Sequence, residues 1–184
     1  MSLSKLISKY SNNSIITLII TTIDSPVGKI VAAADDEFLY LVTFEDSKKI
    51  DKKLRALSKE LPCNFLEGTN KVLKKLKHEL SEYFKGNLKI FSVQIKAIGS
   101  DFQKQVWDQL QQVPYGTYQT YGDIAKSLGR SGNHSRAVGG ACGANTHLLV
   151  VPCHRVVASN SKGGFSSGID RKEWLLEHEK KYTT

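Results

Sequence analysis

Three apolar runs separated by two short turns constrain the fold of the first part of this chain, and the first of these runs is largely β-branched. The runs cover residues 15–23, 29–34 and 38–44, and the turns are Ser25-Pro26-Val27-Gly28 and Asp35-Asp36-Glu37. β-Branched residues favour strands, whereas Ser, Pro, Gly and Asp favour turns. Because links this short join antiparallel neighbours, we predict a three-stranded antiparallel sheet.

Leucines at helical spacing follow the predicted sheet. Leu54, Leu57 and Leu61 fit one face of a short helix. A longer helix is predicted by a second set of residues at the same spacing, Leu73, Leu76, Leu80, Tyr83 and Phe84, with Gly86 suited to end it. These patterns predict an α/β N-terminal domain of residues 1–90, followed by a connecting segment of residues 91–98.

The rest of the chain has helical patterns divided by glycine-containing breaks. A helix capped by Asp101 is expected first, and a final helix is expected at about residues 170–180. Between them, residues 121–128 and 135–143 predict two short helices joined by a turn at 129–133. This order is typical of a helix-turn-helix that lays its second helix on DNA. We therefore predict a mainly α, winged-helix-like C-terminal domain of residues 99–184.

Composition narrows the classes of partner. The formal charge of +8 and the pI near 9.3 favour contact with phosphates, and the 40% hydrophobic content is enough for a packed core. The three cysteines lack the spacing of a zinc site, so no metal and no cofactor are expected. No run approaches the roughly 20 apolar residues that cross a bilayer, so no membrane partner is expected.

A cysteine beside a histidine is the strongest chemical signal in the chain. Pro152 ends the apolar run of residues 148–151, which places Cys153 on a bend. His154 can polarise the neighbouring thiol toward the nucleophilic thiolate. A buried, inert cysteine is the ordinary alternative for such a pair.

The segment Pro152-Cys153-His154-Arg155-Val156-Val157 resembles the active-site motif of the methylated-DNA–protein cysteine methyltransferases, also called O6-alkylguanine-DNA alkyltransferases. The resemblance runs from about Gly99 to Lys180 and is weaker before that. Further segments resemble the family in the same order, namely residues 102–107, 113–116, 120–125, 136–141 and 172–179, with Asn145 at the family's hinge asparagine. The resemblance implies transfer of an alkyl group from O6 of guanine to the protein itself.

The resemblance also implies roles for individual residues. Cys153 is the nucleophile, His154 takes its proton through a bridging water, and Glu179 orients His154. Asn145 links the recognition helix to the active-site turn. Tyr121 donates toward the base and crowds a phosphate, although an aromatic of the core is its ordinary alternative. Sequence alone does not link Glu179 to His154 and would leave it an exposed acid at a helix end.

The lesion pocket and the DNA surface are implied in the same way. The pocket residues are Val156, Phe165, Ser166 and Ser167, where Ser167 replaces a more usual glycine and narrows the room for bulky alkyl groups. The DNA-binding residues are Tyr121, Ser135, Arg136, Ala137, Gly139 and Gly140, with Arg136 filling the gap left by a flipped base. The glycines are unfavourable in a helix, and either close approach to a minor groove or tight helix packing would explain them.

The expected partner is therefore double-stranded DNA containing alkylated guanine, contacted through its minor groove by a monomer. The expected location is the cytoplasm, or the nucleus of a eukaryotic cell. Two alternatives stay open. One is a lesion-recognition protein of the alkyltransferase-like kind, whose members lack the cysteine, and the other is a cysteine hydrolase.

Overall fold

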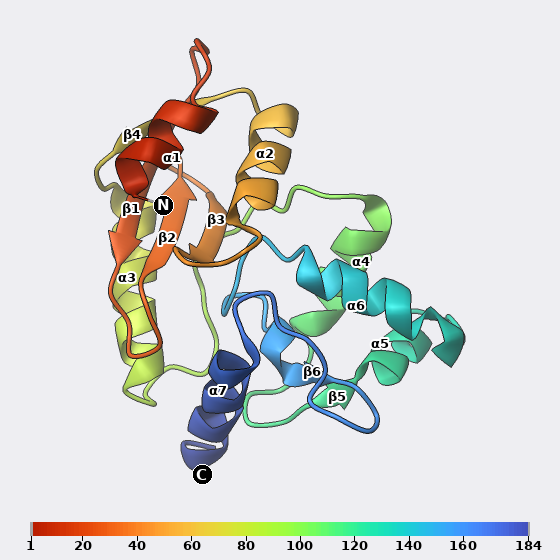
Figure 1. The fold of residues 1–184 in the computed structure, drawn as a ribbon. Coiled ribbons are helices and arrows are strands. Elements are labelled where there is room, and N and C mark those ends of the chain that lie inside the picture. The colour runs from red at the N-terminus through yellow and green to blue at the C-terminus, as the bar shows by residue number, and fades with distance from the viewer. Residues whose placement is uncertain (1, 184) are drawn as a thin grey trace. The chain divides into compact units, whose positions relative to one another are not determined.

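One mixed sheet organises the N-terminal part of the chain (Figure 1). The computed structural model describes residues 2–183, in two units, Met1–Ile98 and Gly99–Thr184. The sheet has the strand order β3-β2-β1-β4, with antiparallel β1–β2 and β2–β3 pairs and a parallel β1–β4 pair. Its strands are β1 (Thr17–Ile23), β2 (Ile30–Ala34), β3 (Leu39–Phe44) and β4 (Asn64–Glu67).

The predicted meander is present, but the prediction of a three-stranded antiparallel sheet was wrong. The fourth strand, β4, lies parallel to β1, with Thr17 opposite Asn64. β4 has four residues, of which Phe65 is buried while Leu66 is 59% exposed. So short a strand carries too little alternation to reveal itself in the sequence.

Helices cover both faces of this sheet, and every residue of β2 and β3 is consequently buried. Helices α1 (Leu3–Tyr10) and α2 (Ile50–Glu60) share one apolar cluster with Val31 and Ala33 of β2. The alternate residues of β2 face the other side, where α3 (Lys71–Phe84) contacts that strand. Residues 91–98 follow α3, and Ile95 forms a bridge with Leu39.

The second unit is mainly helical. Its first helix, α4, is capped by Ser100 rather than by Asp101, in a capping box with Gln103. The Trp107 indole of α4 donates to the Ala141 carbonyl at 2.9 Å and so holds α6. The elements are α4 (Asp101–Leu110), β5 (Gln119–Thr120), α5 (Tyr121–Ser127), η1 (Gly132–His134), α6 (Ser135–Gly143), η2 (Cys153–Arg155), β6 (Val156–Val157) and α7 (Ile169–Lys181).

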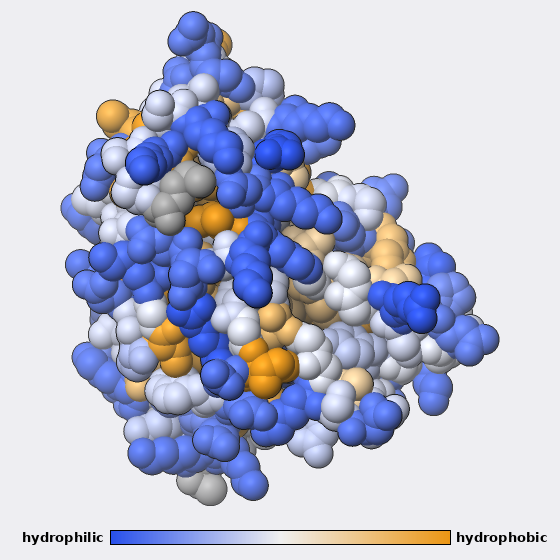
Figure 2. All heavy atoms as spheres, in the orientation of Figure 1, coloured by the Kyte–Doolittle hydropathy of each residue, from blue (hydrophilic) through white to orange (hydrophobic). Residues whose placement is uncertain are grey.

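Hydrophilic residues cover most of the surface seen in Figure 2, and the apolar residues there form small, separate patches. Within residues 2–183, none of the helices has the length and apolar character that crossing a membrane requires.

Candidate active site

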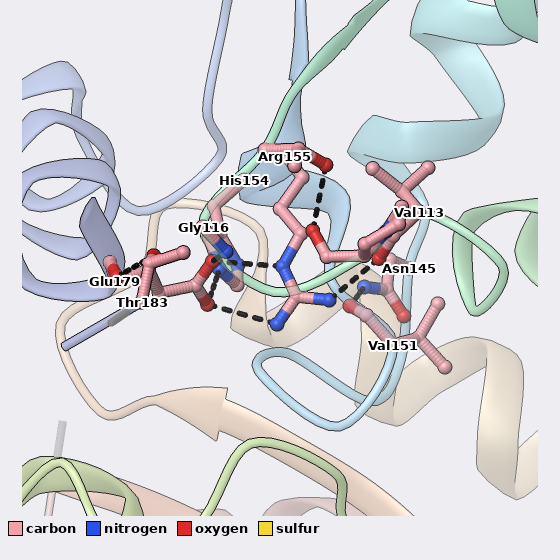
Figure 3. A network of polar contacts seen from close by, with 10 residues as sticks. Val113, Gly116, Asn145, Val151, His154, Arg155, Glu179 and Thr183 are labelled. Carbon is pink, nitrogen blue, oxygen red and sulfur yellow. Dashed lines mark hydrogen bonds and ion pairs between the residues drawn. The ribbon is translucent and has the colours of Figure 1, made fainter.

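The turn between α6 and η2 is tied together by the side chain of Asn145. Its amide donates to the Val151 carbonyl at 2.8 Å (Figure 3). Its oxygen accepts from the His147 backbone N–H at 2.9 Å. Leu149 has a positive φ of 73°, a backbone conformation that costs energy for a residue other than glycine. The Asn145 hydrogen bonds therefore stabilise a strained turn that directly precedes Cys153 and sets its position.

Cys153 and His154 lie at the buried start of η2. Cys153 is only 5% exposed, and His154 is completely buried. None of the three cysteines, all within the described residues, is in a disulfide. A reduced thiol thus stands next to a buried imidazole, in a site that holds off bulk water.

The carboxylate of Glu179, on α7, is the centre of the polar network (Figure 3). One of its oxygens lies 2.6 Å from Nε2 of His154 and 3.0 Å from Nη2 of Arg155. The other accepts from Nε of Arg155 at 2.8 Å and from the Gly116 backbone N–H at 3.3 Å. Arg155 also donates to the Val113 carbonyl at 2.8 Å. The buried carboxylate is therefore paired with a guanidinium and fully hydrogen-bonded.

These contacts decide the charge states of the pair. Burial would raise the pKa of Glu179, but His154 and Arg155 outweigh it, so the pKa is held well below its usual value. The pKa of His154 is lowered, mainly by burial, although Glu179 acts to raise it. His154 is therefore a neutral imidazole beside an ionised carboxylate.

A neutral His154 bound to a carboxylate has a defined tautomer. The carboxylate can only accept, so Nε2 carries the proton and Nδ1 has the free lone pair. Nδ1 is buried and has no hydrogen-bond partner among the described residues. The ring thus presents a basic nitrogen on the side opposite to Glu179.

The short parallel pair of β5 and β6 arranges the segments around η2. Gln119 pairs with Val156 and Thr120 pairs with Val157. Because the strands are parallel, the chain before β5, with Val113 and Gly116, lies beside η2. The chain after β5 begins α5 and lies beside the loop that follows β6.

Tyr121 is the first residue of α5, and its hydroxyl accepts from the Gly164 backbone N–H at 3.3 Å. Burial raises the pKa of Tyr121, and the thiols of Cys142 and Cys153 raise it further. The phenol therefore keeps its proton at neutral pH, close to the Cys153 thiol.

The loop after β6 carries the remaining pocket candidates. Phe165 and Ser166 are half-buried, whereas Val156 and Ser167 are buried. The Ser167 hydroxyl has no hydrogen-bond partner among the described residues. Lys172 of α7 is completely buried and donates to the carbonyls of Val156 and Gly164 at 2.5 and 2.9 Å.

The candidate DNA-binding residues other than Tyr121 lie on α6. Arg136, Ala137 and Gly140 are exposed, and Ser135 and Gly139 are half-buried. A Cβ at Gly139 would lie 3.9 Å from the Tyr121 ring, and one at Gly140 would have no neighbour within 4 Å. Packing inside this unit therefore does not require glycine at either position.

Sequence reasoning assigned no role to Arg155, Lys172 or Gly116, all of which contribute to the site. Lys172 and Glu179 share a helix face with Leu175, at spacings of three and four residues. That pattern could have indicated that both charged residues point inward.

Comparison with known proteins identifies the family. A model of the 6-O-methylguanine DNA methyltransferase DNA-binding domain matches residues 101–181. A model of the ribonuclease-like domain of the same proteins matches residues 18–97. The chain belongs to the 6-O-methylguanine DNA methyltransferase family.

Individual relatives agree with this assignment. The methylated-DNA–protein-cysteine methyltransferase of Methanosarcina acetivorans is 41% identical over 85% of this chain and 94% of its own. A crystal structure of Mycobacterium tuberculosis OGT in complex with DNA is 33% identical, with a TM-score of 0.76 over 91% of this chain and 94% of its own. The O6-methylguanine-DNA methyltransferase of Pyrococcus kodakaraensis is 29% identical, with a TM-score of 0.68 over 88% of this chain and 98% of its own.

The Glu179 network predicts a pH-dependent loss of stability in the variant Glu179→Gln. Removing this charge leaves Arg155 buried without its counterion, so the free energy of unfolding at pH 7 should fall by about 3–5 kcal/mol. Because the pKa of Glu179 is lowered on folding, its contribution is present above the ordinary value of 4.5 and is lost as pH falls further. Urea unfolding at pH 7 and at a series of acidic pH values measures both effects.

Glu177→Gln is the matched control, because Glu177 is exposed on the same helix. It should change the free energy of unfolding by less than about 0.5 kcal/mol. Equal stabilities of the two variants at pH 7 would contradict the structural role of Glu179.

Proposed function

We propose that this family member repairs O6-alkylguanine in double-stranded DNA by moving the alkyl group onto the Cys153 sulfur. The observation that carries the proposal is the buried bond between Nε2 of His154 and Glu179, which leaves Nδ1 of the residue that follows Cys153 without a partner among the described residues. A thiol needs a base, because only a few per cent of an ordinary thiol is ionised at pH 7.

The proton relay runs from Cys153 to His154. In this proposal a water bridges the thiol and Nδ1, and His154 takes the proton. Glu179 then stabilises the imidazolium, as the third member of a triad does. Arg155 and the Gly116 N–H hold the carboxylate in place for this task.

The transfer step is a displacement at the alkyl carbon. The thiolate forms the S–C bond while the C–O6 bond breaks, and the electron pair leaves with guanine. In this proposal Tyr121, whose pKa is raised by burial, donates a proton toward the leaving base. The product is a thioether, which has no carbonyl for water to attack, so each molecule reacts once.

In this proposal the flipped base lies against the loop after β6. Val156, Phe165 and Ser166 provide an apolar wall, an aromatic face and a hydroxyl for the base. Ser167, buried with an unpartnered hydroxyl, stands beside them and restricts the space left for large alkyl groups.

DNA binds along α6 in this proposal, with α5, η1 and α6 acting as the helix-turn-helix. Flipping a base out of the duplex costs about a few kcal/mol, and exposed Arg136 fills the vacated space. Ser135, Ala137, Gly139 and Gly140 present a surface of small residues, which lets the minor groove come close to the helix backbone. Intramolecular packing does not demand the two glycines, so close approach of DNA is the better explanation for them.

A lesion-recognition protein that binds without transfer is the less favoured alternative, because Cys153 is present beside its base. We further propose that the protein works as a monomer. Its location follows its substrate, in the cytoplasm of a prokaryote or the nucleus of a eukaryote.

Transfer is tested by incubating the protein with a duplex that contains O6-methylguanine and weighing the intact protein. We expect a gain of one methyl group per molecule, mapped to Cys153, and no gain in Cys153→Ala. Cys142→Ala and Cys63→Ala are the matched controls and should still gain the methyl group. Binding of the duplex with no gain of mass would favour lesion recognition, and label in Cys153→Ala would remove Cys153 as the nucleophile.

The α6 surface is tested by Gly140→Ala. Alanine favours a helix over glycine by about 1 kcal/mol, so the variant should be as stable as the wild type or more so. The added methyl group should nevertheless weaken binding to an undamaged duplex on the order of tenfold, or about 1.4 kcal/mol. Fluorescence anisotropy at one fixed salt concentration measures the affinity.

Gly68→Ala provides the control for that variant, since its added Cβ meets only ordinary contact at 3.6 Å, in the other unit. It should leave DNA affinity unchanged. Full DNA affinity in Gly140→Ala would mean that the duplex does not approach α6 closely.

A further inference from the structure

Lys172 is a buried cation that the relay of Cys153, His154 and Glu179 does not use. It lies on α7 and is completely buried. Its ammonium group donates to the Val156 carbonyl of β6 and to the Gly164 carbonyl of the pocket loop. It also lies 5.8 Å from the centre of the Tyr121 ring. One group thus contacts three parts of the proposed transfer site.

A buried ammonium group is costly unless an opposite charge compensates it. Arg155, the neighbouring buried cation, has the Glu179 carboxylate as its partner. Within residues 2–183, no carboxylate forms an ion pair with Lys172, whose hydrogen bonds go to neutral carbonyls. The structure therefore retains a positive charge whose counterion is not an acidic side chain.

The thiols are the groups that can supply the negative charge. Burial lowers the pKa of Lys172, whereas ionised Cys153 and Cys142 raise it. By the same interaction, the ammonium group favours the thiolate form of its neighbours. Burial strongly raises the pKa of Cys142, so this thiol stays protonated, and Cys153 remains as the thiol that ionises in the proposed transfer.

Other titratable groups surround these two residues. Tyr121 faces them from α5 and Cys142 from α6, and both remain neutral at pH 7. His154 is neutral, and the charges of Arg155 and Glu179 offset each other. Lys172 is consequently the uncompensated charge of this cluster.

We propose that Lys172 is a positioning residue of the transfer site, serving as the buried countercharge of the Cys153 thiolate and as the clamp that holds the Gly164 loop against β6. The proposal rests on the transfer function above and adds a residue to it. Gly164 directly precedes Phe165, so the clamp fixes the wall of the base pocket at the same time as the charge favours the nucleophile.

Two substitutions separate the charge from the clamp. Lys172→Gln removes the charge and keeps a hydrogen-bond donor, and Lys172→Met removes both at similar volume. The direct readout is the pH dependence of Cys153 alkylation by iodoacetamide, without DNA, measured on the mapped Cys153 peptide. Both variants should move the midpoint of this profile upward by roughly one pH unit, the size expected for loss of a nearby opposite charge.

Methyl transfer from the O6-methylguanine duplex is measured on the same variants. Below the midpoint, a shift of about one unit lowers the thiolate fraction about tenfold, so transfer should slow by at least that factor. Lys172→Met should be slower than Lys172→Gln, because its pocket loop is no longer held. Lys180→Met, on an exposed position of the same helix, is the control and should match the wild type in both assays.

The two proposals fail in different ways. If the wild type takes up no methyl group from DNA, the transfer function is wrong, while the iodoacetamide profiles still report on Lys172. If the wild type transfers methyl but both variants keep its alkylation midpoint and its transfer rate, the role of Lys172 is wrong. A merely structural role would lower stability and leave the midpoint in place.

The wild type provides a test that does not depend on the folding of these variants. The side-chain ¹³Cε resonance of Lys172 should shift at the pH at which Cys153 ionises, and this step should be absent from Cys153→Ala. If the ¹³Cε resonance of Lys172 does not shift when Cys153 ionises, the countercharge role is wrong.

Discussion

The buried carboxylate of Glu179 is the interaction on which the site depends. It joins α7 to η2 through His154 and Arg155, and to the chain before β5 through the Gly116 N–H. The same contacts keep it ionised, which in turn fixes the proton of His154 on Nε2. The Glu179 carboxylate therefore has a structural and a chemical role. Its charge holds three segments together, and its bond to Nε2 leaves Nδ1 of His154 as the basic nitrogen on the opposite side of the ring.

Much of the fold could be predicted from local patterns. The meander and the long helices have strong periodicity, and α6 runs over the residues expected from its sequence, Ser135–Gly143. The fourth strand could not be predicted, because β4 is four residues long and is defined by pairing with β1, far away in the sequence. Helix α1 was missed as well, although Leu3 and Leu6 are part of the core.

The site could be predicted from its motifs only in part. The Cys153-His154 pair is a local signal, so its chemistry could be inferred from adjacent residues. Glu179 is different, since an acid near a helix end is usually exposed and only the fold shows it to be completely buried. The partners of Arg155 and Lys172 are set by tertiary contacts, and no spacing along the chain identifies backbone carbonyls as acceptors. What a sequence conveys best is which residue can react, and what it conveys least is which charges surround that residue.

Burial keeps His154 neutral, and its bond to Glu179 fixes the ring proton on Nε2, which leaves the lone pair on Nδ1. The most direct measurement is the ¹⁵N chemical shift of both His154 ring nitrogens at neutral pH in protein labelled at histidine. We expect a protonated Nε2 and an unprotonated Nδ1, with no protonation of Nδ1 until the pH falls below the ordinary histidine pKa of 6.5. A proton on Nδ1 at neutral pH, in either the neutral or the cationic ring, would contradict this assignment of the ring proton.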